Sequence, residues 1–151
     1  MAVGVTLLSK TVAKANRIEQ KRLDLSETEE VIRVTRLRSY DAGTRAYERV
    51  VLPVGRLRGI TVQGDLASDI ATLAGEYGIV LGKASERVGV VTASKTIARW
   101  LEVEPGARVL RLDRVVLTAD GKPLEWRVTH SVLGVASRSG CPPAAPHRWE
   151  R

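Results

Sequence analysis

Residues 31–38 read VIRVTRLR, and residues 109–116 repeat the pattern as VLRLDRVV. A shift of 78 residues superposes other identical residues along the two copies: Val12 on Val90, Ala15 on Ala93, Leu23 on Leu101, and Gly43 on Gly121. One residue of slippage in the turn also brings Glu48 onto Glu125. Two copies are too few for a solenoid, which stacks at least three units, so the repeat predicts one pseudo-symmetric domain.

Each copy has the pattern of a strand, a short helix, a strand, a turn and a strand. In the first copy, Asn16 and Glu19 have the spacing of a capping box, which predicts a short helix ending near Arg22. The residues Asp41-Ala42-Gly43 then predict a hairpin between residues 31–40 and 46–53.

The second copy predicts a strand over 78–93, a helix over 93–103 capped by Thr92 or Ser94, and a hairpin that turns at Asp120-Gly121. A longer helix over 65–78, capped by Asp65, is expected between the copies. The fold class is therefore α/β (α+β), with a mainly antiparallel six-stranded sheet and helices packed on it.

Size and composition indicate one ordinary globular domain. The chain has 151 residues, of which 44% are hydrophobic and 27% charged, and no apolar run is long enough to span a membrane. The lone Cys141 has no cysteine or histidine pattern around it, so we expect a cytoplasmic protein without a disulfide, metal or cofactor. The net charge of +7 favours an anionic partner, although a diffuse basic surface is more often simply solvated. Periodicity ends after Leu133, so we expect a domain over 1–133 and a mobile tail over 134–151.

Two arginines continue an aliphatic strand face. Because side chains alternate across a strand, Ile32, Val34, Arg36 and Arg38 share one face. An inward guanidinium needs a partner, and its planar fork of donors suits a carboxylate or a phosphate. That partner could be a ligand, or it could be Glu48 across the hairpin in a purely structural salt bridge.

The second copy retains Arg114 but carries Val116 where the first has Arg38, which predicts one anion site rather than two. On the last strand, Glu125, Arg127, Thr129 and Ser131 share one face, so Glu125 could reach the same end of the sheet, while His130 lies on the other face. No catalytic motif or metal-ligand spacing is present, so we predict no catalytic residue.

Several motifs occur in the order found in the UTRA domain, the ligand-sensing module of the HutC branch of GntR-type transcription regulators. The motifs are the R-x-R strand, the hairpin glutamate, the helix ending in Tyr-Gly-Ile, the segment ASKTIARWLEVEPG and the D-G-K-P-L-E turn. The resemblance runs from about Val3 to Leu133 and implies a chorismate-lyase-like fold, a small effector such as a sugar phosphate, organic acid or amino-acid metabolite, and a homodimer.

Carried over by residue, the resemblance makes Arg36 and Arg38 the anion clamp and has Glu48 and Glu125 bonding the polar groups of the effector. Ser131 completes the predicted site where family members usually carry an aromatic residue. Those members also have an N-terminal winged helix-turn-helix that binds DNA, whereas here the first strand begins almost at Met1 and no DNA-binding head is expected in this chain.

The leading hypothesis is a ligand-sensing domain that controls DNA binding by a GntR/HutC-type regulator. One alternative is a chorismate-lyase-like enzyme, for which the sequence offers arginines and carboxylates but no evident nucleophile. The other is a stand-alone dimerisation module in which Arg36 and Glu48 form only a structural pair.

Overall fold

The structure is a computed structural model that describes residues 2–40, 43–57, 60, 66 and 69–132. Its elements, in chain order, are β1 (Ala2–Lys14), α1 (Arg17–Leu23), β2 (Glu30–Tyr40), β3 (Arg45–Pro53), the 3-10 turn η1 (Val54–Arg56), α2 (Ile70–Glu76), β4 (Leu81–Thr92), α3 (Lys95–Leu101), β5 (Arg108–Thr118) and β6 (Pro123–Val132). The strands form one antiparallel sheet in the order β1-β2-β3-β6-β5-β4. This architecture confirms the predicted fold class, whereas the expected tail over 134–151 lies outside the described residues.

The internal repeat is visible in the element boundaries. Helix α1 shifted by 78 residues gives the bounds of α3, and β2 shifted equally gives those of β5. Both helices end at a left-handed residue, Asp24 with φ 54° and Glu102 with φ 59°, which are also 78 apart. The repeat therefore places one copy on each half of the sheet, and the two copies meet where β3 pairs with β6.

Local signals in the sequence account for the short helices. The side chain of Asn16 accepts a hydrogen bond from the Glu19 N–H, and the side chain of Glu19 accepts one from the Asn16 N–H, as the predicted capping box requires. Ser94 caps α3 by accepting from the Ile97 N–H. Each hairpin turn contains a glycine with positive φ, Gly43 at 77° and Gly121 at 89°, which glycine adopts without steric cost.

The helix between the copies is shorter than predicted. It begins at Ile70 and its N-cap is Asp69, whose side chain accepts from the Thr72 N–H, so the predicted start with Asp65 as the cap is wrong. Asp69 offers the same capping oxygen directly before the apolar stretch that packs on the sheet. Leu66 lies outside the helix but is buried in the core.

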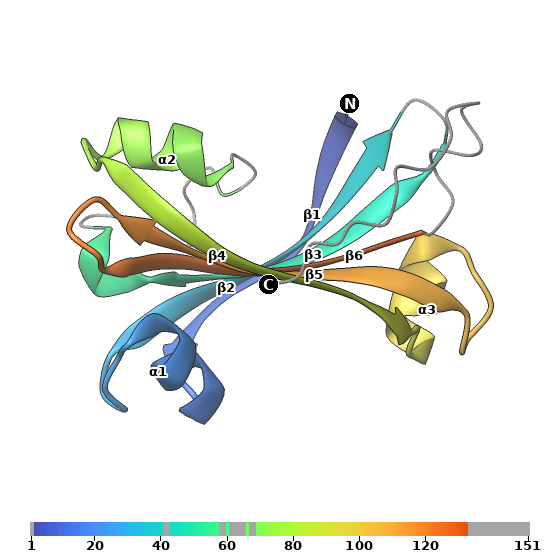
Figure 1. The fold of residues 1–151 in the computed structure, drawn as a ribbon, viewed down its shortest axis with the longest axis horizontal. Coiled ribbons are helices and arrows are strands. Elements are labelled where there is room, and N and C mark those ends of the chain that lie inside the picture. The colour runs from blue at the N-terminus through green and yellow to red at the C-terminus, as the bar shows by residue number, and fades with distance from the viewer. Residues whose placement is uncertain (1, 41–42, 58–59, 61–65, 67–68, 133–151) are drawn as a thin grey trace.

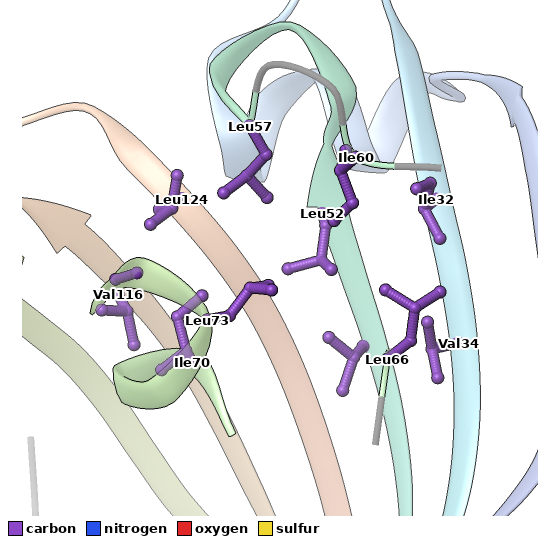
Figure 2. Close-up of a cluster of buried hydrophobic side chains, with 12 residues drawn as sticks. Ile32, Val34, Leu52, Leu57, Ile60, Leu66, Ile70, Leu73, Val116 and Leu124 are labelled. Atoms are coloured by element: carbon purple, nitrogen blue, oxygen red, sulfur yellow. The ribbon is translucent and has the colours of Figure 1, made fainter. Parts of the chain in front are cut away.

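The helices cover the two faces of the sheet unequally. Figure 1 shows α2 above one face, whereas α1 and α3 lie below the opposite face, toward its two ends. Beneath α2 lies the largest cluster of buried apolar residues, shown in part in Figure 2: Ile32, Val34, Val50, Leu52, Leu57, Ile60, Leu66, Ile70, Leu73, Ala74, Val116 and Leu124. We call this side of the sheet the α2 face. Alternation along β2 puts Ile32 and Val34 on it and leaves Val31 and Leu37 to two smaller clusters on the other side.

The two hairpins differ by one bulge. Their turns carry equivalent hydrogen bonds, from Tyr40 N to Thr44 O and from Thr118 N to Lys122 O, so the predicted slippage in the turn is wrong. The register instead shifts inside the second hairpin, where Val116 pairs with Glu125 and Leu117 with Pro123.

This bulge turns two consecutive residues, Leu124 and Glu125, into the protein, where both are buried. The bulge also changes which residue lies opposite the arginine that the two copies share. Arg36 faces Glu48 in the first hairpin, but Arg114 faces Arg127 in the second.

Candidate functional site

Strand β2 carries its two arginines into the protein on the α2 face. Ile32 and Val34 lie in the core under α2, and Arg36 and Arg38 continue the same line of side chains. Only 2% of the Arg36 side chain is exposed, against 17% of Arg38. Arg36 is therefore a fully buried cation, and Arg38 is its more accessible neighbour.

One carboxylate serves both guanidinium groups. The Nε atoms of Arg36 and Arg38 both donate to Oε1 of Glu48, at 3.1 and 3.0 Å. Thr129 donates to Oε2 of the same residue at 3.4 Å, and Nη1 of Arg36 donates to the Leu66 carbonyl at 3.1 Å. One carboxylate oxygen thus accepts hydrogen bonds from both guanidinium groups.

Burial and neighbouring charges act against each other in this cluster. Burial lowers the pKa of Arg36, an effect that Glu48 opposes and Arg38 reinforces. Asp69, the cap of α2, has its pKa lowered chiefly by hydrogen bonding to Thr72 and further by the charges of Arg38 and Arg36. The first turn of α2 therefore lies within the electric field of the two arginines.

Glu125 occupies an apolar part of the α2 face. Its exposed fraction is 1%, and its Oε1 has no hydrogen-bond partner among the described residues. Burial raises the pKa of Glu125, whereas Arg127 and Arg36 act to lower it. A buried carboxyl group with a raised pKa favours its protonated form, which can donate a hydrogen bond.

The structure brings most of the predicted site residues onto one surface. Residues on β6 alternate so that Arg127, Thr129 and Ser131 share the α2 face with the β3 residues that they oppose. Ser131 lies opposite Ala46, two residue pairs further along the sheet than Glu48, and is partly buried. Ser131 contributes no hydrogen bond to the cluster within the described part of the chain.

His130 lies on the opposite face, as its position in the strand predicts. It pairs with Tyr47 and Arg111, and burial together with Arg111 and Arg49 lowers its pKa. It is thus a packed residue away from the arginine cluster. Among the residues that the structure describes, no three His, Cys, Asp or Glu side chains gather as metal ligands. The described helices are also all too short or too polar to cross a membrane.

Comparison with known proteins gives this arrangement its context. The sequence model of the UTRA domain matches residues 1–132. The chain belongs to the UTRA domain family. A GntR-family transcriptional regulator from Enterococcus faecalis V583 has a similar structure, with a TM-score of 0.78 and 25% identity over 87% of this chain and 94% of that one. No curated protein sequence matches the chain.

Two structures of PhnF from Mycobacterium smegmatis share the fold of this UTRA domain at 19% identity. The effector domain of PhnF superposes with a TM-score of 0.79 over 87% of this chain and 82% of that one. A longer PhnF structure superposes with a TM-score of 0.77, and the match covers 58% of its chain. The UTRA match together with the GntR-family regulator from Enterococcus faecalis supports a ligand-sensing regulatory domain.

Some residues of the site were missed by inspection of the sequence. Asp69 was assigned to the interior of a helix, and its place beside the arginines becomes visible only in the fold. Alternation places Thr129 and Arg127 on the strand face of Glu125, but it does not assign either of them to the site. The bond from Thr129 to Glu48 depends on β6 pairing directly with β3.

Proposed function

We propose that this UTRA domain senses a small anionic effector and controls DNA binding by a GntR-type regulator of the HutC subfamily. The effector is a sugar phosphate, an organic acid or an amino-acid metabolite. The observation that carries the proposal is the sharing of Glu48 by Arg36 and Arg38, because two guanidinium groups converge on one carboxylate and Arg38 stays partly accessible beside it. An anionic ligand next to Arg38 accepts charge-assisted hydrogen bonds from its remaining donors.

The two arginines have different parts in this proposal. Arg36 is held by Glu48 and the Leu66 carbonyl, so it positions both of these residues. Arg38 uses only Nε within the described part of the chain, and its two Nη groups remain as a planar fork for a carboxylate or phosphate. Arg38 is therefore the principal anion contact, and Glu48 and Glu125 bond polar groups of the effector beside Ser131.

The site also offers a route from binding to regulation. The Leu66 carbonyl and the Asp69 cap belong to the connection that carries α2, and both lie within reach of the arginine charges. An effector at Arg38 changes those charges and so stabilises one placement of this connection over another. In a homodimer that carries winged-helix heads, such a preference alters the spacing of the heads on DNA.

Calorimetry tests the proposal directly. The protein is titrated with glucose 6-phosphate, 6-phosphogluconate, succinate and glutamate, and the titrations are repeated with Arg38→Met. The control is Arg45→Met, which changes an arginine of the neighbouring strand that pairs with Glu102 at the surface. We expect Arg38→Met to weaken binding at least tenfold and Arg45→Met to leave it unchanged. Equal affinity in parent and Arg38→Met, or no binding by the parent, contradicts the proposal.

An enzymatic role has less support. The described cluster supplies arginines and carboxylates, and the similar structure from Enterococcus faecalis is a GntR-family transcriptional regulator. A dimerisation module without a ligand would need only the buried Arg36–Glu48 pair, and it leaves the second arginine on the same carboxylate unexplained.

A further inference from the structure

The second hairpin of the repeat places two arginines opposite each other on the α2 face. Arg114 pairs with Arg127, at the position where the first hairpin pairs Arg36 with Glu48. Like charges directly opposite on neighbouring strands destabilise a sheet unless an anion lies close to them. Each of these two arginines therefore needs an anion close to it.

Arg114 has its own partner. Its Nε donates to Oε2 of Glu86 on the edge strand β4, at 2.8 Å. The side chains of this pair are 31% and 34% exposed, so the ion pair lies at the rim of the site. Glu86 thus balances the charge of Arg114 and leaves that of Arg127.

Arg127 has no such partner in the described part of the chain. Its Nε is shielded from solvent without a hydrogen bond, and neither a salt bridge nor another hydrogen bond links it to a described residue. Glu125 influences it electrostatically, but the two side chains do not form an ion pair although they share a strand face. Glu125 also has an unpartnered oxygen, so two buried polar groups side by side lack hydrogen bonds.

The position of Arg127 links it to the first anion contact. Arg127 lies two residue pairs along the sheet from Thr129, on the same face, and Thr129 bonds the carboxylate that Arg36 and Arg38 share. Strand β6 is separated from β2 by β3 alone, roughly 10 Å between strand axes, and Arg127 is four residue pairs from the level of Arg38, roughly 13 Å along the strands. Two long arginine side chains on these strands can reach opposite ends of one small molecule.

We propose that Arg127 is a second anion-contacting residue of the effector site, so that the effector carries two acidic groups, one bound by Arg38 and one by Arg127. This inference rests on the proposed function. It narrows the effector to dicarboxylates or to molecules that carry both a carboxylate and a phosphate. Glu125, beside Arg127, provides a hydrogen bond to the second acidic group or to a hydroxyl next to it.

Matched pairs of probes test the inference by calorimetry. The pairs are 6-phosphogluconate with glucose 6-phosphate, and succinate with butyrate, since each pair differs chiefly in one carboxylate. We expect Arg127→Met to weaken binding of the doubly acidic probe about tenfold or more and to leave its singly acidic counterpart within about twofold. Arg49→Met is the control, because Arg49 lies on the neighbouring strand, faces the opposite side of the sheet and is exposed.

Three outcomes separate the inference from the proposed function. If Arg38→Met removes binding and Arg127→Met does not alter it, the inference is wrong and the proposed function stands. If the parent binds no probe, both are wrong. Unfolding of the ligand-free protein gives a further readout, because removal of one of two facing arginines leaves stability unchanged or raises it. A large loss of stability in Arg127→Met would instead assign Arg127 a structural role and overturn the inference.

Discussion

Glu48→Gln gives the sharpest test of the charge arrangement in the site. The substitution keeps the size of the side chain and an oxygen that can accept hydrogen bonds, but it removes the negative charge that two arginines share. Arg36 then becomes a buried cation next to a second cation. Removal of one member of a buried ion pair costs about 3–5 kcal/mol. Because Arg38 is 17% exposed and can turn toward solvent, we expect a loss of about 3 kcal/mol, near the lower limit.

Urea denaturation followed by circular dichroism measures this loss as a change in the free energy of unfolding. In a thermal scan the same loss corresponds to a fall in Tm of about 6–12 °C for a domain of this size. The matched control is Glu102→Gln, since Glu102 pairs with Arg45 at the surface with 64% of its side chain exposed. Exposed ion pairs contribute less than about 1 kcal/mol, so Glu102→Gln should leave the free energy of unfolding almost unchanged.

A double variant separates the charge from the packing. Replacement of both partners, Arg36→Met with Glu48→Leu, removes the desolvated pair as a whole and should recover much of the stability lost in Glu48→Gln. The reasoning is refuted if Glu48→Gln costs no more than Glu102→Gln. It is also refuted if the double variant is less stable than Glu48→Gln alone, because the loss would then come from shape rather than from an uncompensated charge.

Three further predictions concern single residues. The pKa of Glu125 is raised above its usual 4.5, so the unfolded chain releases this proton at a lower pH than the folded protein does. The free energy of unfolding should therefore fall as pH rises from about 4.5 through the raised pKa. Glu125→Gln should remove this dependence from the urea midpoints measured over a pH series. The pKa of His130 lies below its usual 6.5, so stability should be lost as pH falls below about 6.5, and His130→Gln should lessen this loss in thermal scans from pH 7 to 5. A Cβ at Gly82 would lie 2.6 Å from the Thr118 carbonyl oxygen, so Gly82→Ala should cost about 1–3 kcal/mol in urea, whereas Gly89→Ala on the same strand meets open space and should cost far less.

Much of the fold could be predicted because the sequence contains an internal repeat, so that each copy supports the assignment of the other. Alternation along residues 31–38 already assigns Arg36 and Arg38 to the same face as Ile32 and Val34, and the structure has that arrangement. The repeat likewise predicts two hairpins with glycine turns, and both are present. These features depend on residues that are close in the sequence, so hydrophobic periodicity and turn residues are enough to predict them.

The features that the sequence did not reveal depend on pairing between distant segments. The bulge next to Leu124 leaves no mark on alternation, since Pro123 and Leu124 fit a regular strand equally well. That bulge makes Arg127, rather than Trp126, the residue opposite Arg114. Similarly, α2 begins at Ile70 with Asp69 as its cap, and local propensity does not decide between two aspartates that are both suitable caps.

The edge strands differ between the two copies, which bears on the prediction of one anion site rather than two. Arg114 is paired on its outer side with Glu86 of β4, whereas Arg36 is paired on its outer side with Leu7 of β1. An acidic residue on the edge strand balances Arg114 at the rim, where solvent already weakens the charge. Leu7 cannot balance Arg36.

The first copy must therefore take its counter-charge from the inner strand β3, and Glu48 provides it deep in the protein. Arg38 donates to the same carboxylate, so the first copy directs two guanidinium groups at one glutamate. The second copy has Val116 at the position of Arg38, and its Arg114 pairs with Glu86 at the rim. The two copies therefore differ in the arginine that the proposed function assigns to the anion, and this asymmetry favours one effector per domain.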